Sequence, residues 1–377
     1  MHKSITAMSL GLMMIAPVGM MGRTGVPEKA EDGQNRCIVR LVDSVDNSKV
    51  YVLARAFAAK GNTSLKHVYR NSIKGFTVNM PCHAAQTAFG ESALILSMEP
   101  DSVVSIIKKP PSAGGGGKTP PAGQTVSYGT TRVGGPQDGT GHTAWIIDTG
   151  VDLTHPDLNV DTGRSFTVFA RDNANDQNGH GTHVAGIIGA KNNNIGSLGV
   201  APNTAIVPVR VLDRRGSGWL SDVIAGVDYV AANAHAGDCV NMSLGGGVSP
   251  SLDSAVANAS DATHAFFTIA AGNSADDADN SSPARVNGDY VYTVSAVGQY
   301  DAWAYFSNYG NPPVDYAAPG VNIFSLWKDG GTNTISGTSM AAPHACAVLM
   351  LTNGHPGTDS TAIGDPDGND DPIIHLP

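Results

Sequence analysis

Three short segments of the chain carry side chains that together could perform nucleophilic catalysis. One reads as a buried strand that ends in Asp148, one places His180 at the start of a helical pattern, and one places Ser339 at the start of another. A serine hydroxyl is a weak nucleophile, so it needs a base within hydrogen-bond reach and a carboxylate that orients this base. The segments supply these groups, and they span residues 146–150, 178–186 and 336–344.

Each of these residues, taken alone, also has an ordinary structural explanation. Asp148 could cap a helix or a turn, His180 could be a solvated loop residue, and Ser339 could be a helix N-cap. Three long motifs in the order Asp, His, Ser are a more specific signal, because serine hydrolases of different folds carry the same groups in different orders. We therefore predict that the three side chains meet in one site.

The segments around these residues alternate between buried strands and helices. This alternation predicts an α/β fold with a largely parallel sheet that is flanked by helices. Functional residues gather at the carboxyl ends of the strands in such a sheet, and Asp148 ends a predicted strand. Strands are predicted over 144–147, 206–211, 240–244, 265–270 and 292–297, and helices over 181–189, 220–234 and 339–351.

Residues 124–350 resemble the subtilases, near the subtilisins and proteinase K, through the three motifs described above. The resemblance implies a subtilisin-like catalytic domain over 124–377 and the activity of a secreted serine endopeptidase. It also implies that Asn273, in the segment Ala-Ala-Gly-Asn-Ser, donates to the oxyanion of the tetrahedral intermediate beside the backbone N–H of the nucleophile. Without the other motifs, Asn273 would be interpreted as a polar turn residue.

The resemblance further implies which residues bind a protein or peptide substrate. Two extended segments would pair with the substrate backbone by strand addition, largely independently of substrate sequence. Small, uncharged walls at the S1 pocket predict broad specificity with a preference for apolar or aromatic side chains, and Leu220 would border the S4 pocket. The extended segments are Ser243, Leu244 and Gly245 and Gly216, Ser217 and Gly218, and the S1 wall is Ala270, Ala271 and Gly272.

The stretch 191–202, with the sequence KNNNIGSLGVAP, closely resembles the high-affinity calcium loop of the subtilisins. Calcium takes about six to eight oxygen ligands, and the carbonyls of a tight loop supply several of them. The alternative interpretation is a metal-free polar loop. The implied Ca²⁺ ligands are the Asp157 carboxylate, the side chains of Gln124 and Asn193, and the carbonyls of Lys191, Ile195 and Ser197.

Residues 36–107 are predicted to form a separate α+β unit. Its elements follow the ferredoxin-like order β-α-β-β-α-β. The unit resembles the inhibitory propeptide of the subtilases, which implies that it inhibits its own chain until it is cut off. Its strands are predicted at 37–42, 67–69, 75–79 and 93–98, and its helices at 47–59 and 83–89.

Residues 108–123 (KKPPSAGGGGKTPPAG) have the composition of a linker that cannot contribute to a core. Exposed segments of this kind are preferred sites of proteolysis. The match of Gln124 to a calcium ligand near the mature N-terminus predicts that the mature chain begins near Gly123. A first cut nearer Ile107, followed by trimming, remains an alternative.

Residues 1–22 have a short basic start and then an apolar stretch, the layout of a secretory signal peptide. No later stretch approaches the roughly 20 apolar residues of a transmembrane helix. Residues 23–122 hold 13 Lys and Arg against 8 Asp and Glu, whereas residues 123–377 hold 9 against 25. The two parts should attract one another, and the acidic part argues against nucleic acid or an anionic membrane as partner. We expect a secreted monomer.

The four cysteines fall into two pairs of different character. Cys239 lies about 13 Å down a strand from the substrate-binding segment, and Cys346 lies about 10 Å down a helix from the candidate nucleophile. Because these depths agree, the two residues could form a disulfide or could remain as two buried thiols, and the sequence leaves both alternatives open. Cys37 and Cys82 are expected at opposite ends of neighbouring parallel strands, which disfavours a bridge between them.

Two other functions are compatible with a subtilase scaffold. A catalytically silent binding protein usually lacks a triad residue, whereas this chain has all three, and failure to react with a fluorophosphonate would favour that function. A transpeptidase or cyclase usually needs an added domain that shields the acyl-enzyme from water, and the chain shows no insertion of that size. Ligated or cyclic peptide products would favour that alternative.

Overall fold

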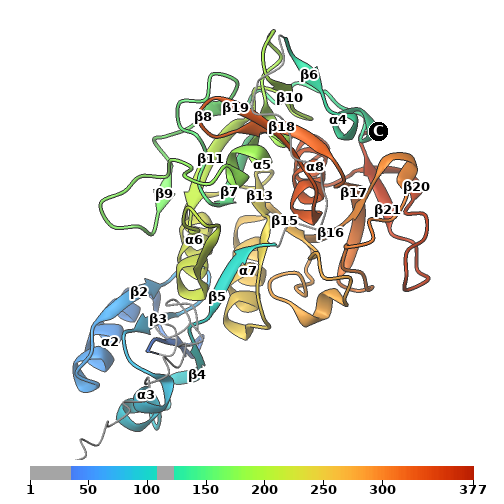
Figure 1. Cartoon of the computed structure of the whole chain (residues 1–377). Coiled ribbons are helices and arrows are strands. Elements are labelled where there is room, and N and C mark those ends of the chain that lie inside the picture. The colour runs from blue at the N-terminus through green and yellow to red at the C-terminus, as the bar shows by residue number, and fades with distance from the viewer. Residues whose placement is uncertain (1–34, 108–122) are drawn as a thin grey trace, which may run out of the picture.

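The computed structural model describes residues 35–107 and 123–377, which form a large α/β body with a small α+β unit beside it (Figure 1). The expected signal peptide at 1–22 and the linker residues 108–122 lie outside the described residues. No helix in the described ranges has both the length and the apolar character needed to cross a membrane.

A mostly parallel sheet forms the centre of the large body, and ten strands belong to it among the described residues. The order is β20-β21-β17-β16-β15-β13-β7-β11-β8, and β9 also pairs with β11. The neighbouring pairs from β21 to β8 are parallel, and only β20 runs antiparallel to its neighbour β21. The strands are β7 (Thr143–Asp148), β8 (Asn159–Val160), β9 (Phe166–Thr167), β11 (Ala205–Arg210), β13 (Cys239–Met242), β15 (Phe266–Ala270), β16 (Val291–Val297), β17 (Val314–Pro319), β20 (Gly357–Thr361) and β21 (Pro372–His375).

Helices cover both faces of this sheet, as the continuous apolar strands require. In β7, Ala144 and Ile146 lie in the core that α5 and α8 complete, whereas Trp145 and Ile147 lie in the core that α6 and α7 complete. Alternate residues of a strand point to opposite faces, so β7 is buried on both sides. The α/β fold with a largely parallel sheet is therefore confirmed. The helices are α4 (Tyr128–Arg132), α5 (His180–Gly189), α6 (Leu220–Asn233), α7 (Pro250–Thr263) and α8 (Thr338–Leu351).

Several elements of the large body were not predicted from the sequence. The most important is a hairpin of β18 (Ile323–Trp327) and β19 (Gly331–Ile335), which packs on α5. Helix α7 was also not predicted, although Ser249 caps it by accepting from Leu252 N and Pro250 opens it. The remaining short elements are β6 (Thr125–Val126), β10 (Ser197–Leu198), η1 (Ala278–Asn280) and η2 (Gln299–Asp301).

The small unit has the predicted order of elements, β-α-β-β-α-β, and its sheet has the strand order β2-β3-β1-β4. The apolar residues of its two helices pack with its own sheet in a separate core. Its elements are β1 (Cys37–Leu41), α2 (Asn47–Lys60), β2 (Leu65–Tyr69), β3 (Gly75–Val78), α3 (Cys82–Phe89) and β4 (Ile95–Pro100).

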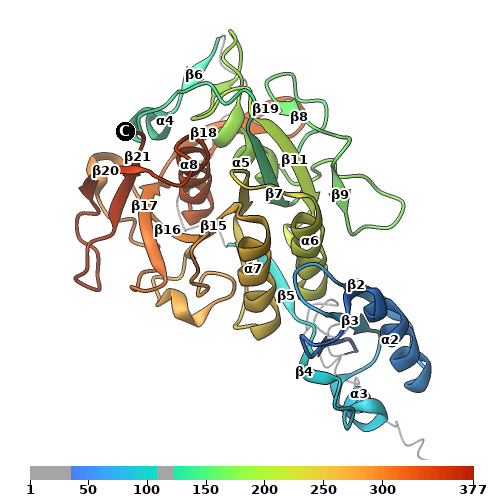
Figure 2. The same ribbon diagram turned by 180° about the vertical axis from the view of Figure 1, so that it is seen from behind.

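A further strand, β5 (Val103–Ile106), leaves the small unit and joins the large body. It pairs antiparallel with β12 (Ser217–Trp219) on one side and with β14 (Leu244–Gly245) on the other. Figure 2 shows the small unit near one end of α6 and α7, with β5 running from it toward the middle of the large body. The chain therefore inserts part of its own N-terminal region between two segments of the large body.

Both pairs of cysteines form disulfides, one in each unit. Cys239 and Cys346 are bridged with a Cα–Cα distance of 5.7 Å, which decides between the two alternatives left open by their depth. The expectation for Cys37 and Cys82 was wrong, because these residues are also bridged, with a Cα–Cα distance of 4.9 Å. Strands β1 and β3 are antiparallel rather than parallel, so Val78, at the end of β3, lies opposite Cys37. Cys82 follows four residues after Val78 and therefore lies near Cys37.

Candidate active site

The carboxylate of Asp148 and the imidazole of His180 form a buried pair at the carboxyl end of β7. His180 Nδ1 lies 2.9 Å from both carboxylate oxygens, and the side chains of Asp148 and His180 are 0% and 7% exposed. A carboxylate on Nδ1 fixes the tautomer of the imidazole and leaves Nε2 available as a base. Two of the three residues predicted to form the site therefore meet with the geometry that the chemistry requires.

Glycine lets helix α5 approach β7 closely enough for this pair to form. A Cβ on Gly181 would lie 2.0 Å from the carbonyl oxygen of Gly150, so only glycine fits next to His180 at this point. Gly179, the residue before the helix, has φ 116° and faces the indole ring of Trp327 at a distance that also excludes a Cβ. The small residues of this motif are thus a packing requirement of the site.

Ser339 is the second residue of α8, so its backbone N–H lies in the first turn of the helix. Ser339 Oγ donates to the carbonyl of Ser243 at 3.3 Å, and Ser243 Oγ donates to the carbonyl of Ser339 at 2.9 Å. Ser339 and His180 line the same cavity, of about 110 Å³, together with Trp327 and Met340. The third residue of the predicted site therefore opens into the space that His180 faces.

The amide of Asn273 is held in one orientation next to Ser339. Asn273 follows β15, and its Oδ1 accepts hydrogen bonds from Thr338 N and Thr338 Oγ1, both at 2.9 Å. Thr338 Oγ1 also accepts from Gly272 N at 3.1 Å. Because Thr338 engages the amide oxygen, the NH₂ group of Asn273 is directed away from Thr338, as an oxyanion donor requires.

Three factors act on the pKa of the His180 imidazole. Burial lowers this pKa, whereas the charge and hydrogen bond of Asp148 and the charge of Asp176 raise it, and the net pKa is above the usual value. Burial lowers the pKa of the neighbouring His183 to about 3, so that histidine stays neutral. His180 is thus the histidine of this helix that can exchange a proton near neutral pH.

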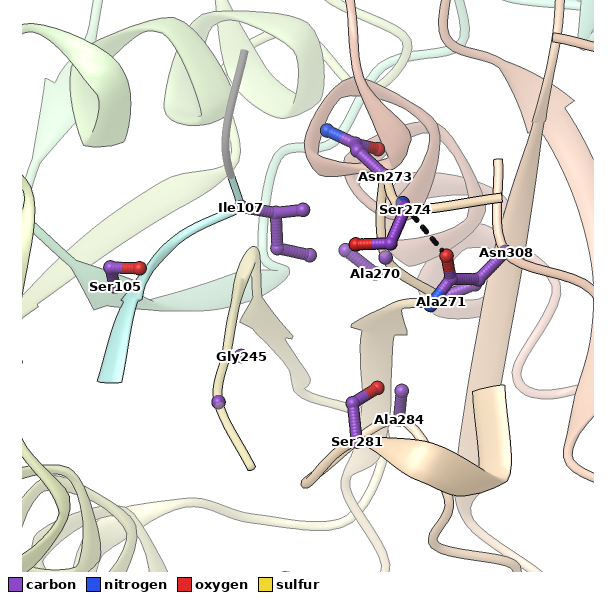
Figure 3. Close-up of a pocket in the computed structure, with 12 residues that line it drawn as sticks. Ser105, Ile107, Gly245, Ala270, Ala271, Asn273, Ser274, Ser281, Ala284 and Asn308 are labelled. Atoms are coloured by element: carbon purple, nitrogen blue, oxygen red, sulfur yellow. Dashed lines mark hydrogen bonds between the residues drawn. The ribbon is translucent and has the colours of Figure 1, made fainter. Parts of the chain in front are cut away.

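A cavity of about 270 Å³ lies beside this group, and it contains the residues expected to form the S1 wall. Ala270, Ala271 and Gly272 line one side, and no charged side chain lines it among the described residues. Figure 3 shows Ile107, which follows β5, between the Gly245 segment and Ala270. The cavity is therefore suited to an apolar side chain.

The two extended segments expected to bind substrate are β12 and β14 with their flanking residues, and β5 lies between them. Val104 is opposite Gly218, Ser105 is opposite both Ser217 and Gly245, and Ile106 is opposite Leu244. Ile106 N donates to the carbonyl of Gly216 at 2.8 Å. Strand addition between these segments is thus realised within this chain.

Leu220 begins α6 and is 1% exposed, in the same apolar cluster as Val104 of β5, which is 2% exposed. The expectation that Leu220 borders a pocket for the fourth side chain before a cleavage point stays a prediction.

The residues expected to bind calcium converge at the start of the large body. Gln124 Nε2 donates to the carbonyls of Lys191 and Ser197, at 2.6 and 2.9 Å. Asp157 accepts from Asn193 Nδ2 at 2.8 Å and from Ser197 N at 3.0 Å. Ile195, the remaining member of the set, lies in the same loop, and its N–H donates to Asn193 Oδ1.

The predicted ligand set fits a calcium ion in its chemistry, because its ligand atoms would be the oxygens of one carboxylate, two side-chain amides and three carbonyls. In this structure the NH₂ groups of Gln124 and Asn193 donate to other members of the set. Burial raises the pKa of Asp157 to about 6, although its hydrogen bonds and the charge of Lys191 act in the opposite direction. Among the described residues, no group of three or more His, Cys, Asp or Glu side chains could hold a metal. The predicted set contains one residue of these types, Asp157.

Three neighbours of the site were not identified from the sequence. Thr338 orients Asn273 and belongs to a motif that had been recognised, so its place before Ser339 was an available signal. Trp327 lines the cavity in front of His180, and only the unpredicted β18–β19 hairpin brings it there. Asn308 accepts from Ser274 N at 2.9 Å and braces the S1 wall from a distant loop, for which the sequence gives no signal.

Comparison with known proteins gives consistent matches. A family model described as "Subtilase family" matches residues 139–361. The chain is 34% identical over 361 residues to Proteinase R of Parengyodontium album, and the aligned region covers 92% of this chain and 89% of that protein. It is 52% identical over 216 residues to Alkaline serine exoprotease A of Vibrio alginolyticus. This aligned region covers 57% of this chain and only 39% of that longer protein.

A solved structure gives the same result. The crystal structure of a cold adapted subtilisin-like serine proteinase matches with a TM-score of 0.58 and 40% sequence identity. This match covers 66% of the present chain and 97% of the other.

Proposed function

The chain belongs to the subtilase family of serine proteases, and we propose that Asp148, His180 and Ser339 form the catalytic triad of a secreted endopeptidase. The observation that carries this proposal is the pair of 2.9 Å contacts between His180 Nδ1 and the Asp148 carboxylate, at a cavity that Ser339 also lines. The apolar start of the chain at 1–22 supports export.

In the proposed mechanism, His180 Nε2 takes the proton of Ser339 Oγ as this oxygen attacks the substrate carbonyl. Asp148 stays ionised and stabilises the imidazolium that forms. His180 then gives the proton to the leaving amine, and water hydrolyses the acyl-enzyme by the same steps in reverse. The Asn273 amide and the Ser339 backbone N–H stabilise the oxyanion, with the positive end of helix α8 behind them.

We propose that the substrate binds as a strand between β12 and β14, as β5 does in this structure. In this register, Ile107 corresponds to the residue before the cleaved bond, because it lies in the cavity lined by Ala270 and Ala271. Val104, three residues earlier, would correspond to the fourth side chain before that bond, and it belongs to the same apolar cluster as Leu220. Apolar residues at both places support the expected preference for apolar or aromatic side chains at S1.

The same register supports autoprocessing and autoinhibition. The unit at 36–107 keeps the substrate-binding segments occupied through β5, so another chain cannot add a strand there. In the proposed register the bond after Ile107 would be the one presented to Ser339, which favours a first cut there over a single cut at Gly123. Trimming of the linker to the region of Gly123 would follow.

Polar contacts outside the cleft support a specific complex between the two units. Asp228, on α6, accepts hydrogen bonds from the backbone N–H groups of Arg70, Asn71 and Ser72 at 2.7–3.0 Å. The side chains of Asn71 and Ser72 also donate to its carboxylate. One carboxylate of the large body therefore binds a complete turn of the small unit.

The start of α6 is bound in a similar way. Asp101 accepts from Ser221 N at 2.9 Å and from Ser221 Oγ at 2.7 Å, which satisfies a free donor at the helix N-terminus. His67 and Lys66 contact Asp222 at 2.6 and 3.4 Å. The contact of Lys66 with Asp222 joins a basic residue of the small unit to an acidic residue of the large body, as the charge difference between the two parts of the chain predicts.

We also propose that Gln124, Asp157 and the loop at 191–197 hold a structural calcium ion. The ion would supply positive charge to Asp157 and fix the loop by coordination. Its proposed role is stability, since β10 of this loop pairs with β6 at the start of the large body.

The proposal is tested by comparing the secreted wild-type chain with Ser339→Ala by intact mass and N-terminal sequencing. Wild type should separate into two chains with a first new N-terminus at Lys108, whereas Ser339→Ala should stay a single chain. Ser165→Ala, which changes a serine in the loop before β9, should mature like wild type. If Ser339→Ala matured to the same fragment without added protease, autoprocessing would be wrong.

A further inference from the structure

A second buried carboxylate, that of Asp176, lies beside His180 and has no role in the mechanism given above. Asp176 is 2% exposed and lies four residues before His180. Its Oδ1 accepts from Asn178 N at 2.8 Å and from Gly179 N at 2.9 Å, and its Oδ2 accepts from Thr182 N at 3.0 Å and from Thr182 Oγ1 at 2.6 Å. One carboxylate thus fixes the backbone on both sides of His180.

The same carboxylate connects this loop to the strand that carries Asp148. Thr149 Oγ1 donates to Asp176 Oδ1 at 2.9 Å and accepts from Gly181 N at 3.0 Å. Thr149 directly follows Asp148, and Gly181 directly follows His180. The Thr149 hydroxyl therefore joins the neighbours of the two residues whose side chains must remain 2.9 Å apart.

The burial of Asp176 is not explained by helix capping alone. An uncharged residue such as Ser or Asn caps a helix about as well as Asp. Burial of the charge is costly, and it raises the pKa of Asp176 despite its hydrogen bonds. Because the cost of burying this charge is not needed for capping, we expect the negative charge of Asp176 to have a function.

The charged and titratable groups around this position are few. Asp148 faces His180 from β7, and Asp152 lies in the turn after β7, where its N–H donates to Thr182 Oγ1. His183 on α5 and His344 on α8 are neutral, because burial lowers their pKa to about 3 and about 4. Asp148 and Asp176 are thus the charges that act on the His180 imidazole.

We propose that Asp176 is a positioning residue for His180, which holds the imidazole in register with Asp148 through Thr149 and adds a second negative charge behind it. This inference rests on the proposed triad. It assigns to one carboxylate both the geometry and part of the electrostatics of the general base. An amide cannot replace it, since the NH₂ group of Asn would face one of the N–H donors.

The test is the pH profile of kcat/KM for Asp176→Asn, measured on a peptide substrate and normalised to active sites titrated with a fluorophosphonate. We expect kcat/KM to fall about 10-fold to 100-fold, mainly in kcat, as for a small misplacement of a catalytic group. The acid limb should move to lower pH, because loss of a negative charge disfavours the imidazolium. A purely structural role would lower the yield of active enzyme but leave the limb in place.

Asp152→Asn is the matched control, since it removes a neighbouring carboxylate that binds Gly330 N and Thr154 rather than the loop before His180. Its kcat/KM and acid limb should stay close to those of wild type. Wild-type behaviour of Asp176→Asn, per titrated active site, would overturn the inference. If wild type itself fails to react with the fluorophosphonate, the proposed triad is wrong instead.

A second pair of variants decides the question if Asp176→Asn does not fold. Thr149→Val removes the hydroxyl that joins Asp176 to Gly181, whereas Thr149→Ser keeps it. We expect Thr149→Val to lower kcat and Thr149→Ser to restore it at similar yields of folded protein. Equal kcat values for the two variants would contradict the proposed connection.

Discussion

At the scale of single residues, the site depends on side chains that are held by their neighbours before any substrate arrives. Asp148 fixes His180, and Thr338 fixes Asn273 through two hydrogen bonds to its amide oxygen. Preorganised donors of this kind stabilise the transition state without reorganisation during the reaction. The predictions at this scale therefore concern rate rather than binding.

Asn273→Ala should lower kcat by about 10²–10³-fold with little change in KM. This magnitude is taken from the corresponding donor in a subtilisin. The physical reason is that, in the proposed role, the amide would contact the oxyanion only in the transition state. Steady-state kinetics on a peptide substrate test the expectation, with the exposed Asn287→Ala as control, and a rise in KM at constant kcat would contradict it.

The dependence of kcat on pH should report the raised pKa of His180. The imidazole acts as a base only when it is neutral, so activity is lost as the pH falls through this pKa. Because the pKa lies above the usual value, the midpoint of the acid limb should lie above about 6.5. An acid limb centred below that value would show that burial lowers the pKa of His180 more than the carboxylates of Asp148 and Asp176 raise it.

At the scale of elements, the sequence predicted the parts that have a strong pattern. Strands β7, β11, β13, β15 and β16 are largely apolar runs, and α5, α6 and α8 have helical spacing, so these elements were predicted within about two residues. Strand β17, which lies between β16 and β21, was not predicted. The β18–β19 hairpin was not, although Lys328–Gly330 has the composition of a tight turn. Trp327, which this hairpin carries, was therefore not predicted as a neighbour of the site either.

The small unit shows a different kind of error. Its elements were predicted correctly, but β1 and β3 were taken to be parallel, and the pairing of Cys37 with Cys82 was rejected for that reason. Strand direction depends on the whole topology and not on local pattern. Asp176 was not identified for a related reason, since its contact with Thr149, which follows β7, joins residues 27 positions apart and forms only in the folded chain.

The loop at 191–197, for which calcium binding is proposed, gives a prediction at this scale. Removal of metal by a chelator should lower the Tm of wild type, and Asp157→Asn should have a lower Tm that the chelator changes little. Differential scanning calorimetry with and without added calcium measures this. An equal effect of the chelator on both proteins would place the responsible ion elsewhere.

The same loop should show a dependence on pH. Without a cation, the raised pKa of Asp157 means that stability is lost as the pH rises from about 4 to about 6. Calcium offsets this loss only when Asp157 is ionised. The rise in Tm on adding calcium should therefore be largest above about pH 6 and should vanish at lower pH.

At the scale of the whole molecule, two units with separate cores are joined through a strand and a polar interface. The strand β5 lies between β12 and β14, and apolar residues of the small unit extend the core beside α6 and α7. These residues are Ile38, Tyr69, Ile73 and Val104. The small unit should therefore bind even after the chain is cut.

Asp228 provides the prediction for this interface. Asp228→Ala should weaken inhibition of the mature enzyme by added 36–107 fragment about 10-fold to 100-fold, because hydrogen bonds to a charged group contribute about 1.5–3 kcal/mol. The activity on small peptides should not change, since Asp228 lies outside the cleft. Asp261→Ala, on the exposed side of α7, is the control, and an unchanged inhibition constant for Asp228→Ala would contradict the role given to this turn.

The central claim is that Ser339 is the nucleophile of a subtilase triad, and the most direct test is the site of covalent labelling. The mature protein would be treated with a fluorophosphonate, digested, and analysed by mass spectrometry. The account predicts one adduct per chain, on Ser339, and its loss in His180→Ala. An adduct on another serine, or no reaction in an enzyme that still cleaves peptides, would contradict it.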